Sequence, residues 1–309
     1  MVPDSVRQQL RYVKVSDGTR LDDFPDFLIV GPQRTGTTWL HAHLRYHPEI
    51  MLSEPKELYF FNNLKTPNSP RFRSNELDWY LQFFREPLTR VVLRNAIALR
   101  RFGRLYRPKV RGEATASYAA LDPDIIAEIT ALKLGIKVIL MIRNPIDRAW
   151  SHAKKDLVRN AKRKFQDVAP EEFERFFTDP YQLQCARYVE NIDHWSAALQ
   201  PDHLLVGFFD DIDRRPEALL LEVMSFLGVT SDRRYISGEV RERVNPTAES
   251  TIPERHRRFL EALFKDELGK LAQRCGVAWP ASGTSSARLP THQAEAATVN
   301  RSSVRSGCP

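Results

Sequence analysis

The sequence has few cysteines and no long apolar segment. Its three cysteines, Cys185, Cys275 and Cys308, are far apart in a chain of 309 residues and show no metal-ligand spacing, which argues against a disulfide framework. We expect them to be reduced thiols. Because no run of about 18 apolar residues exists, no membrane span is expected. The N-terminal stretch MVPDSVRQQLRYVKV lacks the apolar core of a signal peptide, which predicts a cytoplasmic protein.

The sequence also has fewer acidic than basic residues. Lys and Arg number 46 against 39 Asp and Glu, which gives a formal net charge of +7. A positive field favours an anionic cofactor or acceptor, and it also suits nucleic acid. The basic residues are dense from Arg85 to Arg111, where nine of them accompany one acid, Glu86. This stretch matches no nucleic-acid-binding signature, so we interpret it as a solvated face or the border of an acidic acceptor.

Apolar strands that alternate with helices predict an α/β fold. Such strands, buried on both faces, are typical of a mostly parallel sheet covered by helices. We therefore expect a P-loop-like three-layer sandwich, with ligands at the carboxyl ends of the strands. The expected strands are 27–30, 109–112, 137–142 and 203–209. The expected helices are 37–46, 123–134, 146–159, 215–228 and 253–274, with helical pieces within 76–101 and a further helix at RYVENIDHWSAAL.

The chain divides into three parts by composition. Residues 1–25 are a lead-in with few core positions, and residues 26–280 carry the alternating pattern of one domain. Residues 281–309 contain no aromatic residue and offer little to bury, which predicts a disordered tail.

The stretch FLIVGPQRTGTTWL has the form of a phosphate-binding strand, turn and helix. Gly31 and Gly36 have the spacing of a nucleotide-hydrolysing loop, but Thr37 stands where that loop has lysine. A cation occurs three residues earlier, as Arg34. Backbone N–H groups of such a turn and of the following helix bind anions, and the neighbouring threonine hydroxyls can donate as well. A P-loop kinase needs the lysine and magnesium ligands that this pattern lacks.

GPQRTGTTWL closely resembles the 5′-phosphosulfate loop of sulfotransferases that use 3′-phosphoadenosine 5′-phosphosulfate (PAPS). Sulfuryl transfer moves a less charged group than phosphoryl transfer, so neutralisation by a metal matters less. The resemblance implies a catalytic role for Arg34 at the transferring group, and no metal. It also implies a set of residues that bind the co-substrate PAPS, namely Arg34, Thr35, Gly36, Thr37, Thr38 and Trp39.

A second motif, RNPIDRAWS, follows the expected strand 137–142. Its Arg143 and Ser151 can clamp a dianionic phosphate at a strand-to-helix junction. The motif resembles the 3′-phosphate motif of the same family, although Arg143 could instead form a surface ion pair with Asp147. Near EVRERVNP the family places a loop over the nucleotide, which implies binding roles for Arg241 and Arg243.

The stretch SEPKELYFFNN supplies a candidate general base. It resembles the K-E-x-x-F-F segment of heparan-type glycan sulfotransferases, in which the glutamate is the base, and that position falls on Glu57. The alternative for Glu57 is a solvated loop acid or a helix cap. Lys56 and Tyr59 are expected near the acceptor. GEATASY resembles a further family segment and implies that Glu113 and Tyr118 also face the acceptor.

Together the motifs predict transfer of a sulfuryl group from PAPS to a hydroxyl or amine. The acceptor remains open among a glycan, a lipid and a small metabolite, and no nucleic-acid partner is expected. Two other classes of protein stay as alternatives: a P-loop kinase-like phosphotransferase, and a non-catalytic nucleotide- or RNA-binding module. A pure binder has no need of a carboxylate such as Glu57 beside the transferring group.

Overall fold

The centre of the molecule is a five-stranded sheet in which all strands are parallel. The computed structural model describes residues 1–238, 240, 251–279 and 287–288. The strand order is β2-β3-β1-β4-β5. The bounds are β1 Phe27–Val30, β2 Ile50–Leu52, β3 Val110–Ala114, β4 Lys137–Ile142 and β5 Leu204–Phe208. The expected parallel α/β sheet is therefore confirmed.

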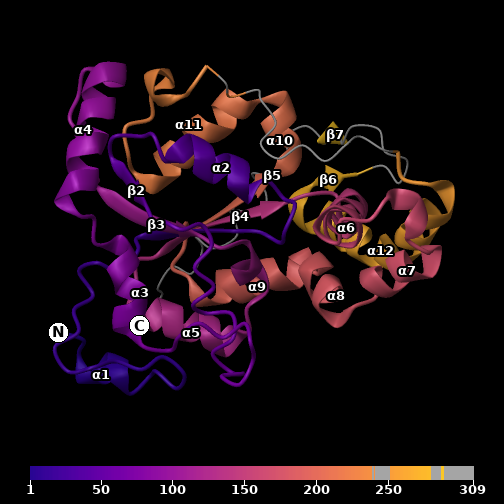
Figure 1. Cartoon of the computed structure of the whole chain (residues 1–309), viewed down its shortest axis with the longest axis horizontal. Coiled ribbons are helices and arrows are strands. Elements are labelled where there is room, and N and C mark those ends of the chain that lie inside the picture. The colour runs from indigo at the N-terminus through magenta and orange to yellow at the C-terminus, as the bar shows by residue number, and fades with distance from the viewer. Residues whose placement is uncertain (239, 241–250, 280–286, 289–309) are drawn as a thin grey trace, which may run out of the picture.

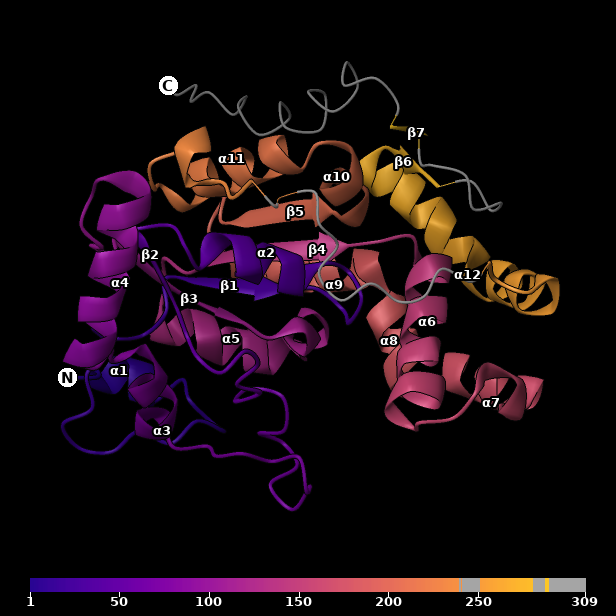
Figure 2. The same cartoon turned by 45° about the horizontal axis from the view of Figure 1, so that its top comes forward.

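Helices cover both faces of the sheet and give three layers (Figures 1 and 2). One face carries α2 Thr37–Leu44, α10 Phe209–Arg214 and α11 Pro216–Leu227. The other carries α3 Leu77–Leu81, α5 Pro123–Leu132 and α9 Tyr188–Ala198. Alternate strand residues pack on opposite layers, as Ile29 and Leu28 do, because side chains point to opposite faces with a period of two.

A helical lobe lies at one end of the sheet (Figure 1). It contains α6 Pro145–Ala153, α7 Pro170–Phe177, α8 Pro180–Ala186 and α12 Glu254–Cys275. The long helix α4, Leu88–Phe102, lies at the opposite end beyond β2, and the short α1 is Asp4–Arg7. None of the described helices has the length and apolarity needed to cross a bilayer.

The structure extends the predicted elements in several places. The expected helix 146–159 is α6 followed by a π-helical segment, Lys154–Asn160. Strand β2 and helices α7 and α8 were not predicted, since three residues of strand or seven to eight of helix carry too little periodicity. The last expected strand, 203–209, corresponds to β5, which is shorter by one residue at each end.

The N-terminal lead-in packs on the domain more closely than expected. Val2, Val13 and Phe24 are buried in the main core. The carboxylate of Glu128 on α5 accepts the backbone N–H groups of residues 11, 12 and 13 at 2.8, 2.8 and 2.9 Å. Of the expected tail, the structure describes only β7, Ala287–Arg288, which pairs antiparallel with β6, Val277–Ala278. Cys185 and Cys275 are free thiols, and Cys308 lies outside the described residues.

The strand order places a ligand site beside β1. Strand β1 lies between β3 and β4. The connection after β1 leads to β2 on the β3 side of the sheet, whereas the connection after β4 leads to β5 on the other side. Crevices at the carboxyl ends of parallel strands form at such a reversal. The backbone N–H of Gly31, just after β1, donates to the carbonyl of Ala116, which follows β3, at 3.2 Å. The loops after β1, β3 and β4 therefore meet at one edge.

The packing of β1 on β3 gives a stability prediction. Gly112 pairs with Phe27, and a Cβ at Gly112 would lie 2.2 to 2.5 Å from three atoms of the Phe27 ring. Gly112→Ala should therefore lower the free energy of unfolding by about 1–3 kcal/mol, measured by urea denaturation. Gly135→Ala is the control, because nothing lies within 4 Å of its added Cβ, and it should change stability by less than about 0.5 kcal/mol. Equal stability of the two variants would contradict the packing argument.

Candidate active site

The loop after β1 contains residues with positive φ, a backbone conformation that glycine adopts most easily. Gly36 has φ +96°, and a Cβ there would lie 2.4 Å from Ile212 Cδ1. Arg34 has φ +79°, in the left-handed region. The hydroxyl of Thr35 donates to the carbonyl of Pro32 at 2.8 Å and closes the turn. This turn leads directly into the N-terminus of α2, where backbone N–H groups favour an anion.

The structure brings the two sequence motifs together. Arg34 Nε donates to Ser151 Oγ on α6 at 2.8 Å. Arg143, at the end of β4, donates from Nη1 to the carbonyl of Arg34 at 3.2 Å. Its guanidinium also lies 4.1 Å from the centre of the Phe209 ring. Residues more than a hundred positions apart thus share one polar site.

The charges at this site favour a ligand with several negative charges. Burial lowers the pKa of Arg34, and the positive charges of Arg143 and Arg159 lower it further. Burial also lowers the pKa of Lys154, and the charges of Arg143 and Arg34 add to this effect. Burial lowers the pKa of Arg143, while the charge of Asp147 opposes that shift. The donor set, two guanidinium groups, an ammonium and a hydroxyl, matches the chemistry of a phosphate or sulfate group.

Lys154 is a member of this cation cluster that sequence reasoning missed. It lies three residues after Ser151, so the two residues share a helix face. The three-residue spacing could have indicated that Lys154 lies beside Ser151. It was not sufficient evidence, because most lysines on surface helices are solvated.

The remaining residues expected to bind the nucleotide differ in their surroundings. Thr35 and Thr37 are buried, and Thr38 is half-buried in the first turn of α2. Trp39 packs in the core beside α11, and its indole N–H donates to the carbonyl of Val240 at 3.2 Å. The side chain of Trp39 therefore fixes α2 to the domain. Arg241 and Arg243 lie outside the described residues.

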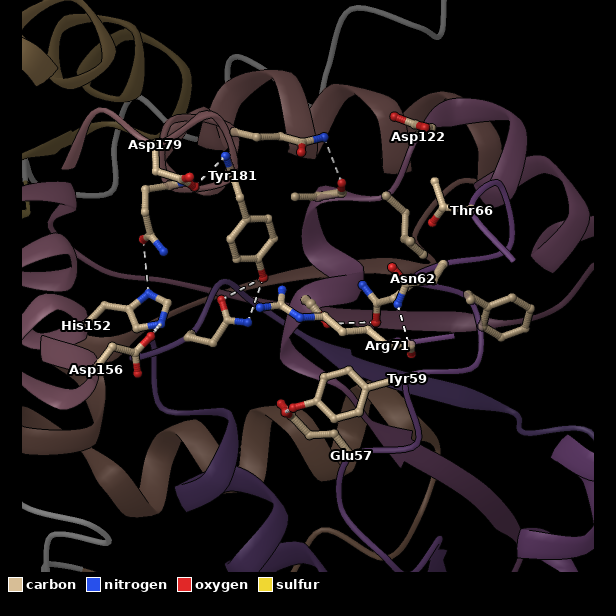
Figure 3. A pocket seen from close by; sticks show the side chains of 18 of the residues that line it. Glu57, Tyr59, Asn62, Thr66, Arg71, Asp122, His152, Asp156, Asp179 and Tyr181 are labelled. Carbon is tan, nitrogen blue, oxygen red and sulfur yellow. Dashed lines mark hydrogen bonds and ion pairs between the residues drawn. The ribbon is translucent and has the colours of Figure 1, made fainter. Parts of the chain in front are cut away.

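Three donors surround the carboxylate of Glu57. Its Oε1 accepts the backbone N–H of Ala116 at 2.9 Å and lies 3.4 Å from Lys56 Nζ. The Tyr59 hydroxyl donates to Oε2. Burial raises the pKa of Tyr59, and the hydrogen bond to Glu57 raises it further, so Tyr59 stays a donor. Figure 3 shows Glu57 and Tyr59 side by side, and these contacts make Glu57 an ordered acid rather than a solvated one.

A cavity of about 1190 Å³ opens beside Glu57. The phosphate-binding loop reaches it through Gln33, whose side-chain amide donates to the Tyr181 hydroxyl on α8 at 2.6 Å. His152, directly after Ser151, lines the cavity as well and lies 3.3 Å from Asp156 (Figure 3). Burial lowers the pKa of His152. The cavity therefore borders Glu57 and the loop after β1, it adjoins the end of the second motif at His152, and it is large enough for a bulky ligand.

Glu113 and Tyr118 are placed differently from the sequence expectation. Both side chains are fully buried and do not line the cavity. Glu113 accepts hydrogen bonds from the hydroxyls of Thr115, at 2.5 Å, and Tyr80. Burial of this carboxyl in the core raises its pKa to about 7.

These buried groups support the loop that carries Glu57. The hydroxyl of Thr115 accepts the backbone N–H of Leu58 at 3.1 Å, and the hydroxyl of Tyr118 accepts that of Phe61 at 3.2 Å. Two of the four residues that follow Glu57 are thus attached to the same buried network. Glu113 and Tyr118 thus support the loop through these hydrogen bonds and do not line the cavity.

The described residues contain no group of three or more His, Cys, Asp or Glu side chains arranged to hold a metal ion. The three histidines of α2 and the following turn, His41, His43 and His47, are mainly packing residues. His47, for example, contacts the carbonyl of Thr230 at 2.9 Å and the ring of Tyr235.

Comparison with known proteins agrees with this geometry. The family model of the sulfotransferase domain matches residues 24–259. The chain is 28% identical over 228 residues to the human bifunctional heparan sulfate N-deacetylase/N-sulfotransferase 2. It is 29% identical over 231 residues to the mouse bifunctional heparan sulfate N-deacetylase/N-sulfotransferase 1. Each match covers 69% of this chain but only 23% of the relative, so the chain spans about a quarter of their length.

A solved structure, the sulfotransferase from Alicyclobacillus acidocaldarius, has the same fold. It aligns with a TM-score of 0.55 at 24% identity, covering 81% of this chain and 94% of that one. The chain belongs to the sulfotransferase domain family, because the family model covers most of its length. The family predicted from the two motifs is thereby confirmed.

The buried carboxyl of Glu113 predicts a pH dependence of stability. Its pKa of about 7 exceeds the usual glutamate value, so the folded protein binds this proton more tightly than the unfolded chain. The contribution of Glu113 to stability is then complete below about pH 4 and is lost as the pH rises through 7. Glu113→Gln keeps the neutral shape at every pH. Between about pH 5 and pH 8 its free energy of unfolding should rise relative to wild type by about 2 kcal/mol.

Denaturation curves at several pH values measure this difference. The exposed Glu76→Gln variant is the control, and its curve should run parallel to that of the wild type. If the stability of Glu113→Gln instead changed with pH as that of the wild type does, the Glu113 carboxyl would have the same charge in the folded and the unfolded chain.

Proposed function

We propose that this chain transfers the sulfuryl group of PAPS to a hydroxyl or amine of an acceptor bound in the cavity beside Glu57. The hydrogen bond between Arg34 and Ser151 carries the proposal, because it joins the phosphosulfate loop to the 3′-phosphate motif in one cationic site. A nucleotide with a 5′-phosphosulfate and a 3′-phosphate has the two anionic ends that such a site needs.

Different residues would bind the two ends of this donor. Arg143 and Ser151 suit the 3′-phosphate, with Lys154 adding positive charge beside them. Arg34 and the backbone N–H groups of residues 34–39 suit the 5′-phosphosulfate, where the turn meets the N-terminus of α2. These groups also stabilise the negative charge that appears on the departing phosphate.

Glu57 has the role of the general base in this proposal. Its carboxylate takes the proton of the acceptor hydroxyl or amine as the acceptor atom bonds to sulfur. The bond between sulfur and the bridging phosphate oxygen breaks, and its electron pair leaves with 3′-phosphoadenosine 5′-phosphate. The N–H of Ala116, Lys56 and Tyr59 fix the carboxylate at the cavity wall, which supports this role.

A glycan is the acceptor class that we favour. The relatives are named heparan sulfate N-deacetylase/N-sulfotransferases, and a cavity of about 1190 Å³ has room for more than one sugar ring. Lys56 and Tyr59, beside Glu57, are the residues that we place next to the acceptor.

The nucleotide assignment predicts a binding defect in Arg143→Ala. The wild type should bind 3′-phosphoadenosine 5′-phosphate more tightly than AMP, measured by isothermal titration calorimetry. A hydrogen bond to a charged group contributes about 1.5–3 kcal/mol, so Arg143→Ala should weaken binding roughly ten- to a hundredfold and remove most of the preference for the 3′-phosphate. Arg187→Ala, an exposed arginine paired with Glu190, is the control and should bind as the wild type does. Equal affinity of the wild type for both nucleotides would refute the assignment.

The base assignment predicts a rate defect in Glu57→Gln. This change keeps the side-chain shape but removes the proton acceptor, so single-turnover sulfuryl transfer should slow by about 10²–10⁴. Affinity for 3′-phosphoadenosine 5′-phosphate should change little, since Glu57 bonds to Ala116, Lys56 and Tyr59, whereas Arg34 bonds to Ser151.

Glu54→Gln is the matched control for this measurement. Glu54 pairs with Arg45 and Arg90 and does not line the cavity, so its loss should affect the rate only mildly. A near wild-type rate for Glu57→Gln would assign the base elsewhere, with His152 the next residue to test. Loss of nucleotide affinity as severe as in Arg143→Ala would mean that Glu57 is structural.

A further inference from the structure

The helix α4 presents an apolar face to solvent. Of its 15 residues only Ala98 is buried. Leu88, Val92 and Leu93 are 82%, 67% and 59% exposed, and Leu99 and Ile97 are 49% and 38% exposed. Surface helices of globular proteins usually turn such residues toward the core. An exposed apolar patch of this kind marks a surface that another partner covers.

The inner side of the same helix is polar. Arg94 is only 13% exposed and pairs with Glu86 at 3.0 Å, and Arg90 lies 3.5 Å from Glu54. The side-chain oxygen of Asn95 accepts the backbone N–H of Tyr106 at 3.0 Å. Polar contacts therefore attach α4 to the domain and leave its apolar side outward.

The outward apolar residues form two rows, which together are called the α4 stripe. Leu88, Val92 and Leu99 lie within about 40° of one another around the helix axis, since successive residues are about 100° apart. Leu93 and Ile97 form the second row, about 100–140° further round from Val92. Leu105, just beyond the helix, is 45% exposed and extends the apolar surface.

Exposed arginines accompany this stripe, although Arg85, Arg90, Arg104 and Lys109 of the same segment pair with acids from elsewhere in the chain. The segment from Arg85 to Arg111 contains nine basic residues and one acid, Glu86, which is paired inward with Arg94. Arg100 and Arg107 are exposed, and neither forms an ion pair within the described part of the chain. The guanidinium of Arg101 lies 4.9 Å from the centre of the Tyr46 ring. The charge of this surface is complementary to a negatively charged partner.

We propose that the outer face of α4 docks on an anionic lipid surface, with the helix in the plane of the interface. A basic amphipathic helix buries its apolar side at the boundary of headgroups and acyl chains, while its arginines contact anionic headgroups. At about 1.5 Å per residue, α4 is about 22 Å long, which suits a helix that lies on a bilayer rather than across it.

The shape and charge of this surface favour lipid over a second copy of the chain. The helix protrudes at the outer end of the molecule, opposite α7 and α12, in both Figure 1 and Figure 2. A protruding helix needs a shaped groove on a protein partner, whereas a lipid interface adapts to it. Two copies meeting at the outer face of α4 would bring the exposed guanidinium groups of Arg100 and Arg101 close to their counterparts, which repels.

Co-sedimentation of the full chain with vesicles tests the proposal. Vesicles of mixed phosphatidylcholine and phosphatidylserine should bind the protein, pure phosphatidylcholine should bind it much less, and added salt should weaken binding. Leu93→Glu should reduce binding by roughly tenfold or more, because it places an anion in the apolar stripe. Arg100→Ala should reduce it about fivefold, since each arginine near an anionic surface contributes about that factor.

Leu134→Glu is the matched control for Leu93→Glu. Leu134 is 69% exposed but lies between α5 and β4, outside the α4 stripe, so this variant should bind vesicles as the wild type does. Circular dichroism checks that both variants are folded. The proposal is overturned if the wild type ignores the anionic vesicles, or if Leu93→Glu binds them undiminished. It is also overturned if sedimentation velocity shows a dimer that Leu93→Glu dissociates while no vesicle binding occurs.

Discussion

The parallel pairing of β1 with β4 is the constraint on which the rest of the site depends. Because Val30 pairs with Leu140, both strands end at the same edge of the sheet. Arg143, just beyond β4, then reaches the carbonyl of Arg34 in the loop after β1. Partial burial lowers the pKa of Arg34 and of Lys154, and repulsion from Arg143 lowers both further. The stable fold therefore keeps an electrostatic cost that an anionic ligand relieves.

A second constraint lies beneath the loop that carries Glu57. The buried carboxyl of Glu113 binds the hydroxyls of Thr115 and Tyr80, and Thr115 in turn binds the backbone after Glu57. A buried polar network of this kind is stable only when its members are satisfied, so it defines one arrangement of the loop. The position of Glu57 at the cavity wall thus depends on a buried polar network that the surrounding core shields from water.

Much of the fold could be predicted from the sequence because many strands and helices are specified by local patterns of apolar and turn residues. Strand β4, Lys137–Ile142, has the predicted bounds, since a run of buried apolar residues between a charged turn and Asn144-Pro145 specifies a strand by itself. Strand β2 has three residues and forms only because β3 pairs with it, so no local pattern revealed it. The lead-in was underestimated for a similar reason: Val2, Val13 and Phe24 are isolated apolar residues that become core only against α5 and its neighbours.

The sequence by itself determined the family and the positions of its two candidate anion-binding motifs, because a glycine-containing turn after a strand and an arginine at a strand end are local patterns. Only the tertiary structure decided which polar residues face a ligand. Glu113 and Glu57 are both acids in loop-adjacent motifs, yet one is fully buried and the other lines the cavity. The apolar side of α4 likewise faces solvent because Arg90 and Arg94 pair with Glu54 and Glu86 on the inner side of the helix. Burial depends on contacts between distant segments, and periodicity along one segment does not contain that information.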